Sequence, residues 1–221
     1  DAVAADNCSV AGISYVMSGA TVKASTSGQV GTYTFNRGVT TITYTVTDGS
    51  GNTSSASMTV TVNDQQVPVI TAPTAVSVNA GTGTCQAINV AIGTPVTSDN
   101  CSVASVTNDH VSTTYPLGTT TVVWTVTDGS GNTATASQTV TVRDAQAPAI
   151  TAPVNMTVST DAGSCSATVA SLGTPVTSDN CSVASVTNNH SSSTYPKGVT
   201  TVIWTVTDGS GRSEEHTSEL Q

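Results

Sequence analysis

Acidic and amide side chains recur at three kinds of position in this 221-residue chain, and together they could bind a cation. One aspartate lies in a linker just before a proline, an Asp-Asn pair opens each D-N-C-S segment, and another aspartate opens each D-G-S-G segment. Calcium takes roughly six to eight oxygen ligands from such carboxylate, amide and main-chain groups. The candidate ligands form two sets, Asp64, Asp99, Asn100 and Asp128, and Asp144, Asp179, Asn180 and Asp208. The alternative is that each aspartate only accepts hydrogen bonds within its own turn.

Cysteines at positions 8, 85, 101, 165 and 181 offer a second kind of chemistry. An interval of 16 residues separates Cys85 from Cys101 and Cys165 from Cys181, and it predicts the disulfides Cys85–Cys101 and Cys165–Cys181. Each would close a loop worth about 3 kcal/mol of stability. The partner of Cys8 would then lie upstream of Asp1. A zinc site is disfavoured, because the sequence has no C-x-x-C and no paired histidines. Disulfides imply an oxidising compartment, outside the cell or in the periplasm.

The histidines do not form a catalytic pattern. His110 follows Asp109, but its copy His190 follows Asn189, so no acid accompanies both. The sequence contains no G-x-S-x-G motif and no repeated Ser-His-Asp order. We therefore expect no enzymatic activity and no cofactor other than calcium at the joints between domains.

Internal repeats organise the chain. The segment GTPVTSDNCSVASVTN occupies residues 93–108 and again 173–188, an offset of 80, and TVTDGSG begins at 45, 125 and 205. These offsets predict a repeat of about 80 residues. The expected domains are residues 1–64, a repeat truncated at its N-terminus, residues 65–144, a complete repeat, and residues 145–211, a repeat that lacks its last strand.

The final ten residues, RSEEHTSELQ at 212–221, differ from everything before them. They contain all three glutamates of the chain, and they stand where the third repeat should continue as NTATASQTVTVRD. Written back as AGA TCG GAA GAG CAC ACG TCT GAA CTC CAG, they resemble a sequencing-adapter oligonucleotide read in frame. We expect this segment to be an artefact rather than part of the repeat.

Alternating hydrophobicity predicts the strands that position these residues. In TTTVVWTVTDGSGNTATASQTVTV, Val122, Trp124 and Val126 alternate with polar neighbours, and apolar residues alternate again after the turn. Asp128 and Asn132 should make local hydrogen bonds in that turn. Short strands with frequent turns predict an all-β fold of tandem immunoglobulin-like, or fibronectin-III-like, β-sandwich repeats. In such a sandwich the first strand and the loops holding D-N-C-S and D-G-S-G meet at one end, which would gather each candidate calcium set.

The segment YPLGTTTVVWTVTDGSGNTATASQTVTVRD, preceded by ITAPTAVSV and followed by QAP, resembles the hyalin repeat (HYR). That family's signature is an aromatic-Pro-x-Gly-Thr-Thr strand that runs into T-D-x-S-G-N. The resemblance implies immunoglobulin-like extracellular modules, which occur in tandem on adhesive or surface proteins, including bacterial ones. Its better-known animal members place a cysteine on the last strand, where this chain has Met58 and Gln138.

Composition narrows the partners. A formal net charge of -9 with only 9% charged residues repels phosphate backbones and anionic lipids, so we expect neither nucleic-acid binding nor membrane insertion. We expect a non-catalytic structural or adhesive array, a stalk or adhesin segment of a large secreted or surface-anchored protein. The alternatives are a glycan- or protein-binding accessory module and a spacer attached to a secreted hydrolase. The expected partners are neighbouring repeats and a glycan or surface-protein ligand, at an extracellular or cell-surface location.

Overall fold

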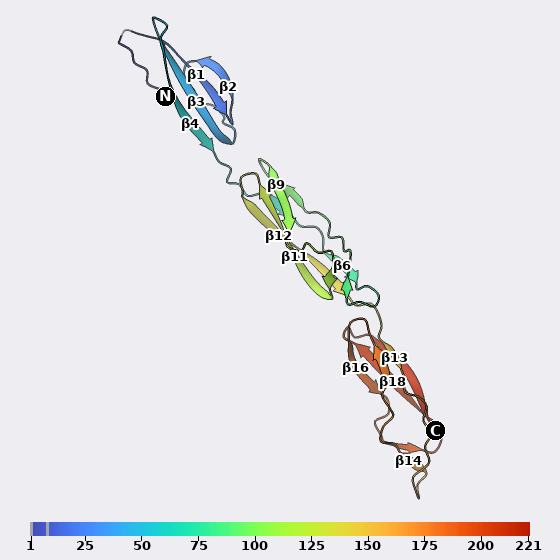
Figure 1. Ribbon diagram of the computed structural model, residues 1–221. Helices are drawn as coiled ribbons and strands as arrows, with labels where there is room; N and C mark the ends of the chain where they lie inside the picture. The colour runs from blue at the N-terminus through green and yellow to red at the C-terminus, as the bar shows by residue number, and fades with distance from the viewer. Residues whose placement is uncertain (1, 8) are drawn as a thin grey trace. The chain divides into compact units, whose positions relative to one another are not determined.

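The computed structural model describes residues 2–7 and 9–221, and strands account for all of its regular secondary structure in that part of the chain (Figure 1). The chain divides into two compact units. One comprises Asp1–Val69, Thr97–Val106 and Val126–Ala134, and the other comprises Ile70–Val96, Thr107–Thr125 and Thr135–Gln221. No helix among the described residues is long and apolar enough to cross a membrane.

The first repeat is built on one four-stranded sheet with the strand order β2-β1-β3-β4. Its strands are β1 (Val10–Gly19), β2 (Lys23–Ser27), β3 (Gly38–Asp48) and β4 (Thr53–Val62). Because side chains alternate between the two faces of a strand, Ile42 and Tyr44 of β3 point to the same side and pack with Tyr15 and Met17 of β1. These four side chains form the buried core of this repeat.

The second repeat combines a four-stranded sheet, order β6-β12-β11-β9, with the strand pairs β10-β7 and β5-β8. Its strands are β5 (Val69–Thr71), β6 (Val76–Asn79), β7 (Gln86–Ala87), β8 (Val96–Ser98), β9 (Val103–Asn108), β10 (Tyr115–Pro116), β11 (Gly118–Asp128) and β12 (Thr133–Arg143). Buried side chains of both sheets share one core, in which Tyr115 of β10 packs with Trp124 of β11 and Val140 of β12. The predicted β-hairpin and the all-β sandwich are confirmed.

The third repeat has the same plan, with a sheet of order β16-β18-β19 and the pairs β13-β15 and β14-β17. Its strands are β13 (Ala149–Thr151), β14 (Ser166–Thr168), β15 (Val176–Ser178), β16 (Val183–Asn188), β17 (Thr194–Pro196), β18 (Thr200–Asp208) and β19 (Ser213–Leu220). Val202, Trp204 and Val206 of β18 are buried on its inner face, as their counterparts are in β11.

The expectation that the third repeat lacks its last strand is wrong for the structure, because residues 213–220 form β19 along the whole of β18. The register runs from Thr200↔Leu220 to Thr207↔Ser213. A strand is held to its neighbour by main-chain hydrogen bonds that almost any sequence can make. Burial also alternates along the end of the segment, as in a strand with one buried face, since Ser218 and Leu220 are buried while Thr217 and Glu219 are exposed. Its origin as an adapter artefact stays a prediction.

Candidate cation sites and cross-links of the acidic loops

Each D-G-S-G turn is organised around its aspartate. Oδ1 of Asp128 accepts hydrogen bonds from the main-chain N–H groups of Ser130 (2.8 Å) and Asn132 (2.8 Å), and its Oδ2 accepts one from Nδ2 of Asn132 (2.8 Å). Asp48 binds Ser50 and Asn52 in the same way. Gly131 has a φ of 90°, a conformation that favours glycine. The predicted local hydrogen bonds of these turns are confirmed.

These hydrogen bonds keep the aspartates charged. Burial alone would raise the pKa of Asp128, but the side chain of Asn132 and the N–H groups of the turn stabilise the carboxylate, so the pKa lies below its usual value. The pKa of Asp48 is also lowered, chiefly by the side chain of Asn52. For Asp208, burial is outweighed by main-chain hydrogen bonds from Arg212 and Ser210 and by the charge of Arg212, and its pKa is again lowered.

In the second and third repeats, the aspartate of the D-N-C-S loop has one carboxylate oxygen that accepts no hydrogen bond. Oδ1 of Asp99 accepts from the N–H groups of Cys101 (2.9 Å) and Ser102 (2.9 Å), and Oδ2 of Asp179 accepts likewise from Cys181 (2.7 Å) and Ser182 (2.8 Å). The other oxygens, Oδ2 of Asp99 and Oδ1 of Asp179, are buried and accept no hydrogen bond. A buried carboxylate oxygen without a donor is destabilising unless a cation satisfies it.

The structure brings three members of the first predicted set together. Carboxylate oxygens of Asp64, Asp99 and Asp128 lie within 4.8 Å of one another, and we call these residues the first cluster. Oδ2 of Asp64 is buried and also lacks a hydrogen bond. Asn100 is adjacent, but it directs Nδ2 toward Oδ1 of Asp64, at 3.5 Å, rather than an oxygen. The first cluster therefore has the donor chemistry of a hard-cation site.

The second predicted set is arranged differently, because a guanidinium already lies within it. Asp144 and Asp179 come within 4.8 Å of each other, together with Cys181. Nη2 of Arg212 lies 2.8 Å from Oδ1 of Asp144 and 3.2 Å from Oδ2 of Asp208. Arg212 also donates to the carbonyl oxygens of Asp144 and Gln146. We call Asp144, Asp179 and Asp208 with Arg212 the second cluster.

The positions of Asn132 and Arg212 correspond in the two repeats, each being the sixth residue of T-D-G-S-G-x. Nδ2 of Asn132 donates to the carbonyl oxygens of Asp64 and Gln66, both at 3.2 Å. Both side chains therefore hold the linker that precedes their repeat. This role was not predicted from the sequence, although the shared position directly after D-G-S-G is a signal that could have indicated it.

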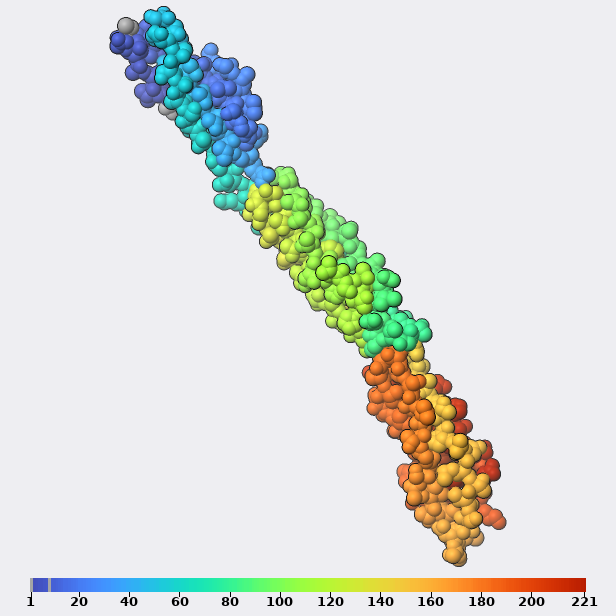
Figure 2. Space-filling view, in the orientation of Figure 1, coloured from blue at the N-terminus to red at the C-terminus, as the bar shows by residue number. Residues whose placement is uncertain are grey.

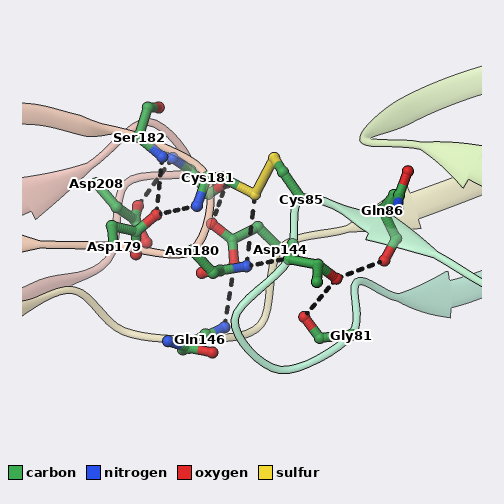
Figure 3. Close-up of a disulfide and its surroundings, with 12 residues drawn as sticks. Gly81, Cys85, Gln86, Asp144, Gln146, Asp179, Asn180, Cys181, Ser182 and Asp208 are labelled. Atoms are coloured by element: carbon green, nitrogen blue, oxygen red, sulfur yellow. Dashed lines mark hydrogen bonds between the residues drawn. A yellow bond between two sulfur atoms is a disulfide. The ribbon is translucent and has the colours of Figure 1, made fainter.

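The predicted disulfides are wrong, because the structure joins Cys85 to Cys181 (Figure 3). Cys101 and Cys165 are free, exposed thiols. The carbonyl of Cys165 accepts from the N–H of Lys197, before β18 begins, whereas the loop of Cys181 lies beside Gly209, after β18 ends. At about 3.3 Å per residue, a strand of this length separates its ends by roughly 25 to 30 Å. A disulfide needs Cα atoms within about 7 Å. Cys8 lies outside the described residues.

The histidines have structural surroundings. The rings of His110 and Tyr115 stack at 4.3 Å, and Nδ1 of His110 lies 2.8 Å from the carbonyl oxygen of Ser112. His190 repeats the arrangement with Tyr195. Both histidines thus pack against the core tyrosine of their repeat.

A second missed residue is Gln138, which the sequence placed on the last strand of the second repeat. It is 2% exposed, and its Oε1 accepts a hydrogen bond from the indole Nε1 of Trp124 (3.0 Å). Its Nε2 donates to the carbonyl oxygens of Thr74 and Ile92, both at 2.8 Å. The polar residue in an otherwise apolar alternation was the signal for this buried network.

Fold and loops together define a class of protein, tandem β-sandwich modules whose polar side chains gather on the linkers between modules. Comparison with known proteins agrees. Residues 13–62 match the HYR domain, in agreement with the resemblance seen in the sequence. Hyalin of Strongylocentrotus purpuratus is 30% identical over 210 residues, and hyalin of Lytechinus variegatus is 32% identical over 207. These alignments cover 90% and 88% of this chain, but the chain spans only 17% and 38% of the two hyalins.

The solved structures that resemble this chain include cadherin fragments. Human CDH23 EC21-23 gives a TM-score of 0.39 at 11% identity, over 95% of this chain and 88% of that one. Drosophila N-cadherin EC1-4 gives 0.37 at 11% identity, over 90% and 59%. At these scores the likeness carries no argument about function.

Proposed function

We propose that this chain is a non-catalytic segment of an extracellular or cell-surface protein, in which tandem modules serve as a stalk or adhesive array. The observation that carries the proposal is the set of hydrogen bonds from the residue after each D-G-S-G segment to the linker before its repeat. Asn132 and Arg212 bind the main chain of the linkers at Asp64 and Gln66 and at Asp144 and Gln146. These side chains therefore attach the D-G-S-G turn of a module to the linker that connects it to the module before.

Hydrogen bonds to a linker limit the relative orientations that two neighbouring modules can adopt. A flexible linker lets two modules sample many orientations, whereas hydrogen bonds to its carbonyl groups restrict its dihedral angles. The disulfide from Cys85 to Cys181 adds a covalent restraint between the second and third repeats. An array with restrained joints transmits force and holds its ends apart, which are the needs of a stalk.

We also propose that the first cluster binds calcium. The chemistry of the donors supports it, because carboxylates of Asp64, Asp99 and Asp128 converge and two of their buried oxygens accept no hydrogen bond. The guanidinium of Arg212 supports it further, since a positive group lies among the carboxylates of the second cluster. Calcium held by Asp64 would tie the linker to the loops of Asp99 and Asp128, and so reinforce the same joint.

The location and the partners of the protein are also part of the proposal. A disulfide between repeats favours an oxidising location. We propose neighbouring repeats and a glycan or surface protein as the partners. We propose no catalytic step, because the polar groups of the loops are used on their own turns and linkers.

Limited proteolysis tests the linker contacts. Asn132→Ala removes the bonds to the carbonyl groups of Asp64 and Gln66, each worth about 0.5 to 1.5 kcal/mol, so cleavage within residues 63–67 should accelerate on the order of fivefold. Asn52→Ala is the matched control, because Asn52 bonds Asp48 as Asn132 bonds Asp128 but makes no hydrogen bond to a linker within residues 2–7 and 9–221. Equal cleavage in the two variants would contradict the proposal.

A further inference from the structure

The cysteines fall into two structural types that alternate along the chain. Cys85 and Cys165 each lie in a short turn that leads into the first strand of a β10-β7 or β14-β17 pair, and Cys101 and Cys181 each lie in a D-N-C-S loop. We call the first type the turn cysteines and the second type the loop cysteines. The disulfide joins the turn cysteine of the second repeat to the loop cysteine of the third, over a sequence separation of 96.

Both turns have the same main-chain geometry. The turn before Cys85 is closed by hydrogen bonds from Gly81 N to Gln86 O (2.9 Å) and from Thr84 N to Gly81 O (3.0 Å). The turn before Cys165 is closed by the corresponding bonds, Asp161 N to Ser166 O (2.8 Å) and Ser164 N to Asp161 O (3.0 Å). Cys165 is therefore presented as Cys85 is, but it has no partner.

Two polar side chains dock the loop of the third repeat onto the turn of the second. Nδ2 of Asn180 donates to the carbonyl oxygen of Thr84 (2.9 Å), and Oε1 of Gln146 accepts from the N–H of Gly83 (3.1 Å). Figure 2 shows the green chain of this turn against the orange chain of the third repeat, beside the disulfide drawn in Figure 3. The disulfide is thus the covalent part of a polar contact with its own recognition groups.

The same recognition groups accompany the free loop cysteine. Asn100 precedes Cys101 as Asn180 precedes Cys181, and Gln66 occupies the linker position of Gln146. Asn100 directs Nδ2 to Oδ1 of Asp64 (3.5 Å) and to Sγ of Cys101 (3.6 Å). The carbonyl of a turn is what Asn180 binds at the equivalent place. Cys101 and Cys181 therefore share the hydrogen bonds within their own loops, since Nδ2 of the preceding asparagine lies 3.6 and 3.5 Å from the sulfur and the N–H of each cysteine donates to the aspartate two residues before it.

We infer that disulfides link successive modules rather than closing loops within one, with each turn cysteine bonded to the loop cysteine of the next module. Cys101 takes the turn cysteine of the module before it, and Cys165 takes the D-N-C-S cysteine of a module after it. The counterpart turn for Cys101 falls about 16 residues before Cys8, by the spacing of the other repeats. Each bond forms by exchange with a disulfide oxidant such as oxidised glutathione, in which two thiols lose two protons and two electrons and the oxidant becomes two thiols.

The first test maps the linkages in the full chain. The oxidised chain is alkylated without reduction, digested and analysed by mass spectrometry, and we expect one linked peptide pair, Cys85 with Cys181, and alkylated Cys101 and Cys165. In Cys85→Ser, Cys181 should become alkylated, whereas the control Cys165→Ser should leave the linkage intact. A peptide that links Cys85 to Cys101, or Cys165 to Cys181, would overturn the inference.

The second test supplies the missing partner. Residues 212–221 are replaced by residues 132–144, followed by a further copy of residues 145–211, and the longer chain is oxidised with glutathione disulfide. We expect Cys165 to lose its alkylation and to be linked to the D-N-C-S cysteine of the added repeat, while the last turn cysteine stays alkylated. Continued alkylation of Cys165 in the folded chain would overturn the inference, and the linkage map of the unextended chain tests it even if the longer chain does not fold. The inference rests on the tandem arrangement, and proteolysis of the linker under reducing conditions tests the proposed function separately.

Discussion

Arg212 places Nη2 of its guanidinium 2.8 Å from Oδ1 of Asp144, so one positive charge lies among the three carboxylates of the second cluster, whereas its counterpart Asn132 is a neutral amide. The side chain of Asp144 is fully buried in this pair. The second cluster therefore contains a cationic side chain at the position where the first cluster has an amide.

Calcium should bind once in this chain. We expect isothermal titration calorimetry to give one site for the unaltered protein and two for Arg212→Asn, which restores the residue found at Asn52 and Asn132. Asn132→Arg should abolish the first site by supplying a guanidinium to Asp64 and Asp128. Thermal unfolding should shift upward with calcium and downward with a chelator only where a site remains. A melting temperature insensitive to calcium and chelator in the unaltered chain would contradict the proposed site.

Gln138 should contribute more to the free energy of unfolding than its counterpart Ser218. Gln138→Ala leaves the indole of Trp124 and the carbonyl groups of Thr74 and Ile92 without partners, so the second repeat should lose roughly 2 to 4 kcal/mol. Ser218→Ala removes a single bond to Trp204 (3.2 Å) and should cost about 1 kcal/mol. Urea unfolding followed by tryptophan fluorescence measures both, with Trp204→Phe or Trp124→Phe isolating each repeat. Equal losses of stability in the two variants would show that the additional hydrogen bonds of Gln138 do not stabilise the second repeat.

Stability should fall in acid because of the turn aspartates. The pKa of Asp128 is lower in the folded chain than its usual value, so its stabilisation is present above the unfolded pKa, near 3.8, and is lost as the pH falls through the folded value. Asp48 and Asp208 act in the same direction. Asp128→Asn should therefore lower stability at pH 7 and weaken its dependence on pH below about 4. A variant that keeps the full acid dependence would contradict this assignment.

The terminal strand should stabilise the third repeat despite its foreign composition. Deleting residues 213–221 uncovers the edge of β18 and the buried side chains around Trp204, and should cost on the order of 3 kcal/mol. Fluorescence of Trp204 during urea unfolding measures the loss. Replacing the segment with the second repeat's TATASQTVT should instead increase stability, since it restores Gln at position 218. No change on deletion would mean that β19 does not pack as described.

Local patterns predicted most of the fold. Val122, Trp124 and Val126 alternate in a strand because one face is buried, and Asp128 organises its turn through bonds that lie within five residues. The first cluster could also be predicted from the sequence, since a β-sandwich brings the loops of Asp99 and Asp128 to the linker at Asp64.

The cysteine pairing needed tertiary information. The 16-residue interval looked local, but the length of β18 separates Cys165 from Cys181, and the bond is made to the neighbouring module instead. The roles of Gln138, Arg212 and the terminal strand were missed for a similar reason. Each stabilises the structure through contacts with residues that are far away in the sequence. A polar residue within an apolar alternation marked Gln138, but only the structure identified the carbonyl groups that it satisfies.

The central claim is that the loop residues restrain the joints between modules. Small-angle X-ray scattering of the oxidised chain, with and without Asn132→Ala and Cys85→Ser, tests it most directly. The account predicts that one narrow set of conformations fits the data from the unaltered chain, and that the double variant needs a broad ensemble. An unaltered chain whose scattering already requires a broad ensemble, unchanged by the substitutions, would contradict it.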